Sequence, residues 1–231
     1  MIRILHAADL HLDSPFAALA PDQAAQRREE QRQLVRRLAE ECVRRNCQLL
    51  LLAGDLFDSD RVYRETAELL CEVLGSIRTR VFIAPGNHDP WSPVSPYATL
   101  PWPENVHIFR SRTVEAVQLE DPELTVYGAA FTGAHTEGLL KEFRAEENGL
   151  PQIMVIHGVL GDPASPYNPI DPEEVGPPGW TIWPWATSTK AICKASAKPP
   201  SSIPAAPWAG ASTRPAPRAP STPSWTRPAA G

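Results

Sequence analysis

Apolar residues in the first half of the chain fall into short continuous runs, which are separated by longer segments with helical spacing. The runs at 2–5, 48–53 and 80–84 predict strands, and the run at 48–53 is apolar throughout, as in a strand covered on both faces. Residues 22–46 and 63–78 each place apolar side chains on one helical face, which predicts two amphipathic helices. This alternation indicates an α/β fold with helices on the outside of the sheet.

The second half of the chain is richer in strand signals and then loses its periodicity. The predicted elements are strands at 106–109, 114–119, 125–127 and 152–156, and a helix at 138–147. After about residue 161, proline, alanine and serine dominate, and the spacing of apolar residues fits neither a helix nor a strand.

Charge divides the chain in the same region. All 27 acidic and 16 of the 22 basic residues lie in 1–179, a net charge of −11, whereas 180–231 carries six basic residues and no acidic one. A segment of this second kind buries too little apolar surface to offset the entropy of ordering its backbone. We therefore expect a folded domain over 1–178 and a disordered tail over 179–231.

Composition also excludes several classes of protein. No apolar run reaches the roughly 18 residues of a membrane span, and the apolar start is too short for a signal peptide, so we expect a soluble, cytoplasmic protein. The four cysteines form no C-x-x-C pair, which argues against a zinc site built from cysteine. The net charge of −5 indicates no broad basic surface, so any contact with nucleic acid must be local.

Polar clusters follow four of the predicted strands. A lone aspartate or histidine at a strand end is more often a turn former or a satisfied polar residue than a ligand. Four such clusters are a stronger signal, because the carboxyl ends of strands in an open α/β sheet are where ligands bind. Carboxylate, imidazole and amide groups without cysteine suit Mn, Fe or Zn. The clusters are Asp9 with His11, Gly54 with Asp55, Gly86 to Asp89, and His157 with Gly158.

In this order, the motifs D-x-H, G-D, G-N-H-D and H-G resemble those of the calcineurin-like metallophosphoesterases. The stretches HAADLHLDSPF, LLAGDLFD and APGNHDPW resemble more narrowly the SbcD-type DNA repair exonucleases, including their YhaO-like branch. The resemblance covers roughly residues 1–175. It implies an α/β metallophosphoesterase sandwich of two mixed β-sheets flanked by helices, truncated at the C-terminal side.

The resemblance also implies the ligands of two divalent metal ions, most simply Mn. Asp9 and His11 would hold one ion, Asn87 and His157 the other, and Asp55 would bridge the two. One bridging carboxylate keeps two such ions about 3.5–4 Å apart.

Two neighbouring residues receive catalytic roles by the same resemblance. His88 would protonate or stabilise the leaving oxygen of the scissile phosphate. Asp89 would either orient the His88 ring or cap the following turn. Asp13 and Asp58 are candidates for supporting the ligands. The remaining histidines match no motif, and we expect structural or surface roles for them: His6, His107 and His135.

One motif of the family is missing from this sequence. The motif Gly-His-x-His follows the H-G element and supplies an imidazole to each ion, but there is no histidine after His157. Because tryptophan has a single codon, the reading frame around Trp180, Trp183 and Trp185 can be partly reconstructed. Shifted by one base, it permits Asp-Tyr-Leu-Ala-Leu-Gly-His-Ile-His-Lys, an apolar strand followed by the missing motif. We therefore interpret residues 179–231 as out of frame, the alternative being a genuine Pro/Ala/Ser-rich tail.

By resemblance, the expected activity is that of a hydrolase, a Mn-dependent phosphodiesterase or exonuclease that acts on DNA ends in DNA repair. The implied partners are DNA and an SMC-like ATPase of the SbcC type; a homodimer is left open and no membrane contact is expected. Two alternatives remain. One is a small-molecule phosphatase or phosphodiesterase with the same site, and the other is an inactive truncated product that lacks the Gly-His-x-His ligands.

Overall fold

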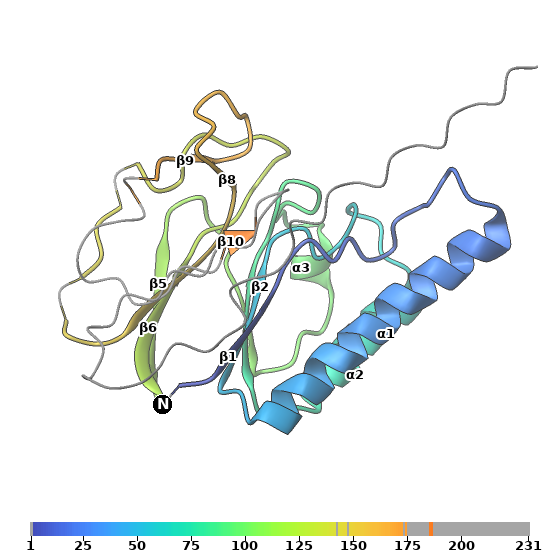
Figure 1. The fold of residues 1–231 in the computed structure, drawn as a ribbon, viewed down its shortest axis with the longest axis horizontal. Helices are drawn as coiled ribbons and strands as arrows, with labels where there is room; N and C mark the ends of the chain where they lie inside the picture. The colour runs from blue at the N-terminus through green and yellow to red at the C-terminus, as the bar shows by residue number, and fades with distance from the viewer. Residues whose placement is uncertain (1, 142, 147, 173, 175–184, 187–231) are drawn as a thin grey trace, which may run out of the picture. The chain divides into compact units, whose positions relative to one another are not determined.

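The computed structural model describes residues 2–141, 143–146, 148–172, 174 and 185–186. The first sheet contains four parallel strands in the order β1-β2-β3-β4 (Figure 1). The predicted strands of the first half are confirmed to within a few residues. They are β1 (Ile4–Ala7), β2 (Leu49–Ala53), β3 (Arg80–Ala84) and β4 (Val106–Ile108).

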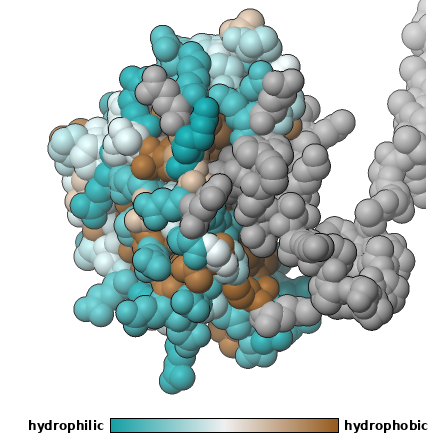
Figure 2. Space-filling model, turned by 90° about the vertical axis from the view of Figure 1, so that its left-hand side faces the viewer, coloured by the Kyte–Doolittle hydropathy of each residue, from teal (hydrophilic) through white to brown (hydrophobic). Residues whose placement is uncertain are grey.

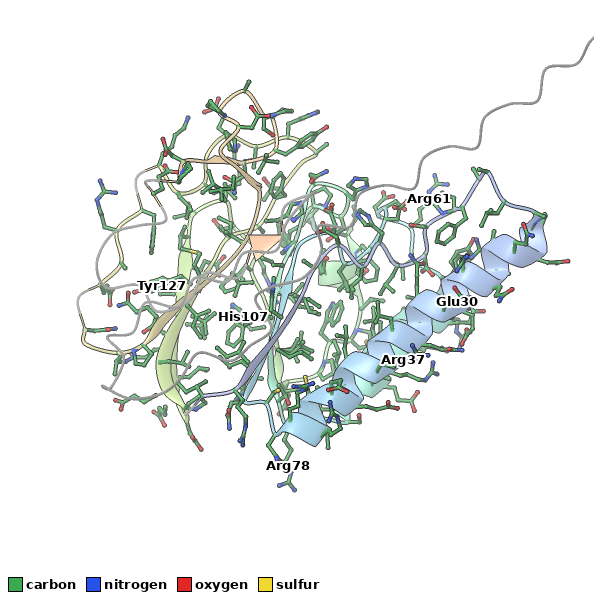
Figure 3. All side chains as sticks on the ribbon, viewed as in Figure 1. Glu30, Arg37, Arg61, Arg78, His107 and Tyr127 are labelled. Atoms are coloured by element: carbon green, nitrogen blue, oxygen red, sulfur yellow. The ribbon has the colours of Figure 1, made fainter. Side chains whose placement is uncertain are left out.

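Two helices cover one face of this sheet. The helix α1 (Pro21–Arg45) starts with a proline at its first turn and ends at Asn46 in the left-handed conformation, a common way to close a helix. The helix α2 (Arg64–Gly75) packs beside it, and a short helix α3 (Pro96–Thr99) follows β3. Both predicted amphipathic helices are confirmed, and charged residues such as Glu30 and Arg37 lie on the exposed side of α1 (Figure 3).

A second sheet has the order β10-β7-β6-β5. Its strands β5 and β6 are antiparallel, and the other neighbours are parallel. Among the described strands, only this second sheet is mixed. In the first sheet, helices or long loops return the chain to the same end before each new strand, which makes neighbours parallel. The strands are β5 (Glu115–Glu120), β6 (Glu123–Gly128), β7 (Gln152–His157) and β10 (Trp185–Ala186), and a separate pair is formed by β8 (Val159–Leu160) and β9 (Pro169–Ile170).

The two sheets pack face to face. On β2, Leu50 and Leu52 contact the helix side, whereas Leu49 and Leu51 contact residues of the second sheet such as Ile153. This double coverage confirms the prediction for the continuous apolar run at 48–53. At the far edge, β5 alternates half-buried and exposed residues, and Figure 2 shows apolar side chains emerging between hydrophilic ones on that face.

The described residues of 138–147 do not form the helix that was predicted there. Its described residues form turns and coil, and Leu140 and Phe143 pack against the outer face of the second sheet. The backbone N–H of Leu139 is bonded to the side-chain oxygen of Asn168, at 2.7 Å. A contact from a distant part of the chain therefore overrides the local helical spacing.

Within the predicted disordered tail, the structure describes residues 185–186. They form β10, which pairs in parallel with the end of β7 and differs at this point from the expectation of a wholly unstructured segment. The remaining residues from 179 onward lie outside the described part of the chain. Among the described residues, no helix is long and apolar enough to cross a membrane.

Candidate metal centre

The carboxyl ends of β1, β2, β3 and β7 bring the four predicted clusters together. Asp9 and His11 follow β1, Asp55 follows β2, Asn87 follows β3, and His157 is the last residue of β7. Because β1, β2 and β3 are parallel, their carboxyl ends lie at one edge of the first sheet. The end of β7, in the second sheet, meets this edge, with His157 Nε2 3.6 Å from Oδ2 of Asp55.

Asp55 lies at the centre of these residues. Its carboxylate belongs to two groups whose potential ligand atoms all lie within 4.8 Å of one another, one with His11 and His88 and the other with Asp9 and His157. The Nε2 atoms of His157 and His11 lie 3.6 and 3.9 Å from the same Asp55 oxygen, Oδ2. The resemblance assigns Asp9 and His11 to the same ion, and the structure also places Asp9 in one group with His157. In both arrangements Asp55 is shared.

The amide of Asn87 completes the second group. His157 is buried, and its Nδ1 lies 3.3 Å from the backbone oxygen of Ala53. Its Nε2 lies 3.0 Å from Asn87 Oδ1 and 3.6 Å from the Asp55 carboxylate. With the proton on Nδ1, the lone pair of Nε2 and the two oxygens would converge on a bound cation.

The electrostatics of Asp9 fit the same conclusion. Burial raises the pKa of Asp9 above its usual value; the neighbouring His157 opposes this effect, and the nearby Asp55 carboxylate adds to it. A divalent ion between the two carboxylates would stabilise their charged forms. The donor set of carboxylate, imidazole and amide oxygen, without thiolate, suits Mn, Fe or Zn.

The backbone at the site is held in a sparsely populated conformation. Asp9, His11 and Asp55 have φ values of 51°, 44° and 49°, in the left-handed region that non-glycine residues rarely adopt. Two backbone hydrogen bonds maintain it, from Asp9 N to Gly54 O at 3.2 Å and from His11 N to Asp55 O at 2.9 Å. Such strain gathers at functional sites, where the surrounding structure holds it in place.

Two glycines allow the loops to approach this closely. A Cβ atom on Gly86 would lie 2.1 Å from Oδ1 of Asp55. One on Gly54, whose φ is +81°, would lie 2.1 Å from Nδ1 of His157. Both positions therefore require glycine, and the G-D and G-N-H-D motifs reflect packing as well as chemistry.

His88 lies at the exposed rim of the site. Its backbone N–H donates to Asp55 Oδ1 at 3.1 Å, and its ring meets the His11 ring edge to face, with centroids 4.8 Å apart. The side chain is thus free to reach a substrate while its backbone is tied to the central carboxylate.

Asp89 does not orient the His88 ring in this structure. Its carboxylate is buried and accepts hydrogen bonds from Gly86 N, from Phe57 N and from the hydroxyl of Tyr97. Burial raises the pKa of Asp89 to about 7, against the opposing effect of these hydrogen bonds. Asp89 therefore braces the loop after β3 against the loop after β2, a role that neither sequence-based alternative describes.

The two acidic residues expected to support the ligands differ in position. Asp58 Oδ1 lies 3.3 Å from Nδ1 of His11, on the side of the ring away from Asp55. Asp13 instead binds the start of α2, accepting from Tyr63 N and from the hydroxyl of Thr66. Only Asp58 therefore touches a candidate ligand.

Sequence reasoning missed three residues near the ligands. The side chain of Gln31 donates to the backbone oxygen of His11 at 2.7 Å, the ring of Phe131 meets His157 edge to face, and Asn168 donates to the backbone oxygen of His157. None lies in a motif, so no local signal marks them. The remaining histidines lie in the sheets or on the surface, as expected: His6 and His107 are on β1 and β4, and His135 stacks on Tyr167.

A two-sheet α/β sandwich with an aspartate shared between histidine, aspartate and asparagine side chains is typical of a metal-dependent hydrolase. The Calcineurin-like phosphoesterase family matches residues 2–176, and the chain belongs to this family. Membership indicates metal-dependent hydrolysis of phosphoesters.

A curated relative is similar to this chain. It is the "Uncharacterized metallophosphoesterase YhaO" of Bacillus subtilis (strain 168), 30% identical over 198 residues. The match covers 79% of this chain and 47% of the relative, so the chain spans about half of that protein's length.

Proposed function

We propose that this protein is a Mn-dependent phosphodiesterase that acts as an exonuclease on DNA ends in DNA repair. The observation that carries the proposal is the pair of ligand groups that share Asp55. The family supports phosphoester hydrolysis, and the motif stretches that resemble SbcD-type exonucleases support DNA as the substrate.

The ligand residues would hold two ions in the manner that such chemistry requires. Asp55 would contact both ions, and Asp9, His11, Asn87 and His157 would complete their coordination. Bound divalent ions lower the pKa of water and neutralise phosphate oxygens.

His88 is the group placed to move a proton. It is exposed, and its backbone N–H is anchored on the same carboxylate that would bridge the ions. We assign to His88 the protonation of the leaving oxygen of the scissile phosphate. A general acid must lie within hydrogen-bonding distance of the oxygen that it protonates. Asp89, bound to the loop backbone, supports His88 only through that loop.

Two substrates separate DNA cleavage from small-molecule hydrolysis. The purified chain is incubated with Mn²⁺ and either end-labelled linear double-stranded DNA or bis-para-nitrophenyl phosphate, with EDTA as the blank. The proposal expects cleavage of both, with mononucleotides released from the DNA ends. Turnover of the small diester with intact DNA would refute the DNA assignment and favour a small-molecule phosphodiesterase.

A second candidate, an inactive product, is favoured by the lack of any histidine after His157. Ala186 in β10 is the register partner of His157, so a Gly-His-x-His motif at this position would lie beside the ligands. The test replaces residues 180–189 with Asp-Tyr-Leu-Ala-Leu-Gly-His-Ile-His-Lys. Activity gained only in this variant supports the second candidate, and equal activity in both chains refutes it. Resequencing the gene across these codons tests the frame itself.

The wider assembly is part of the same proposal. An SMC-like ATPase of the SbcC type would deliver DNA ends, and a homodimer would present two sites. Co-purification with such an ATPase, and the mass in solution, test these two points separately.

A further inference from the structure

Asn168 joins three separate segments beside the candidate ligand His157. It is fully buried, with 0% of its surface exposed, and each end of its carboxamide has a partner. Its Nδ2 donates to the backbone oxygen of His157 at 2.7 Å, and its Oδ1 accepts from Leu139 N at 2.7 Å. Its backbone N–H donates to Thr136 O, and its carbonyl accepts from Val159 N.

The fit around this side chain is close. Asn168 has a φ of 47°, a left-handed conformation that asparagine tolerates better than most residues. A Cβ atom on Gly158 would lie 2.6 Å from the backbone oxygen of Asn168 and 2.7 Å from its Nδ2. The glycine of the H-G motif therefore makes room for this asparagine.

The hydrogen bond from Asn168 lies where the pairing of β7 with β6 has ended and only β10 still pairs with β7. The pairing of β7 with β6 ends at Val155, two residues before His157. Beyond that point the carbonyl of His157 has no partner on β6, and the Asn168 carboxamide takes this place. The end of β7 is thus held by β10 on one side and by the Asn168 side chain in place of β6.

The ring of His157 has little freedom once this backbone is held. It lies against Gly54, its Nδ1 faces Ala53 O, and its Nε2 faces Asn87. A small rotation of the backbone at His157 would move Nε2 away from the Asp55 carboxylate, 3.6 Å away.

We propose that Asn168 is a positioning residue that holds His157 in the orientation required to bind a metal ion. The inference rests on the proposed role of His157 as a ligand. Asn168 touches neither ion nor substrate; it acts through the backbone oxygen of His157.

The test uses Asn168→Gly in the full chain, because glycine accepts the left-handed backbone and removes only the carboxamide. The matched control is Asn148→Gly, which removes a carboxamide that bonds Thr125, Leu150 and Gln152 at the other end of β7. The first readout is the NMR spectrum of the His157 ring in metal-free protein. Asn168→Gly should shift or split the His157 signals and leave those of buried rings such as Phe82 in place, and the control should leave both unchanged.

The second readout is the affinity for Mn²⁺ by calorimetry. Removing a group that orients a ligand weakens metal binding by about 10–100-fold, which we expect for Asn168→Gly and not for the control. If Asn168→Gly does not fold, Asn168→Asp serves instead, since it keeps the shape and the acceptor for Leu139 but cannot donate to His157.

Unchanged His157 signals in the variant would overturn the role of Asn168, as would changes spread equally over all buried rings. If the wild-type chain binds no Mn²⁺, the proposed function is overturned instead. The NMR comparison of the metal-free proteins then still tests whether Asn168 holds the His157 ring.

Discussion

Burial of His6 predicts that this protein loses stability in mild acid. His6 lies on β1, on the face shared with Ile4 that packs against the second sheet, and its register partner is Leu51. Its Nε2 is buried and has no hydrogen-bond partner within the described residues. Desolvation lowers the pKa of His6 from 6.5 to about 4, because the charged imidazole is unfavourable in this apolar layer.

The sign of the effect follows from proton binding in the two states. Between pH 6.5 and about pH 4 the unfolded chain binds a proton at His6 and the folded chain does not, so stability falls as the pH falls through this range. A pKa lowered from 6.5 to about 4 corresponds to a loss of about 3 kcal/mol when complete, of which about 2 kcal/mol is expressed by pH 5.

The assay compares urea unfolding of the wild-type chain and His6→Leu at pH 7.5 and pH 5, with EDTA present so that metal binding does not contribute. Other groups titrate equally in both proteins, so the difference between them isolates His6. We expect the variant to gain about 2 kcal/mol relative to wild type on going to pH 5. Ile4→Leu, on the same face of β1, is the non-titrating control. A difference that stays constant within about 0.5 kcal/mol would refute the reasoning.

Three further outcomes test the site. Gly86→Ala places a Cβ 2.1 Å from the Asp55 carboxylate. It should lower the free energy of unfolding in urea by about 1–3 kcal/mol and should also weaken Mn²⁺ binding. The control Gly133→Ala, whose Cβ meets nothing within 4 Å, should change neither quantity. Asp55→Asn should weaken Mn²⁺ binding by more than about 100-fold in calorimetry, since both ligand groups share this carboxylate; retained affinity would exclude the site. Tyr97→Phe removes a hydroxyl donor from buried Asp89 and should lower the free energy of unfolding by about 1–3 kcal/mol; an unchanged urea midpoint would show that this bond does not brace the loop.

The sequence by itself determined the two amphipathic helices and the strands β1 to β7, and its motifs, through their resemblance to a known family, indicated the candidate ligands. Continuous apolar runs and helical spacing are local signals, and they placed the strand at 48–53 and the helix at 22–46 within a few residues of their final bounds. The polar residues at the strand ends were found in the same way. Since parallel strands end at one edge of a sheet, the approach of Asp9 and Asn87 to Asp55 could be expected, whereas that of His157 depends on the packing of the second sheet on the first.

Only the tertiary structure decided what holds those ligands in place. Asp89 bonds Phe57, 32 residues away, and Asn168 bonds Leu139, 29 residues away, in place of the helix that the local spacing predicted. Neither contact leaves a periodic pattern or a motif in the sequence. Each forms only because loops that follow different strands meet at the same end of the molecule. Local patterns thus indicated the candidate ligands, and long-range packing placed Asn168 against the backbone oxygen of His157.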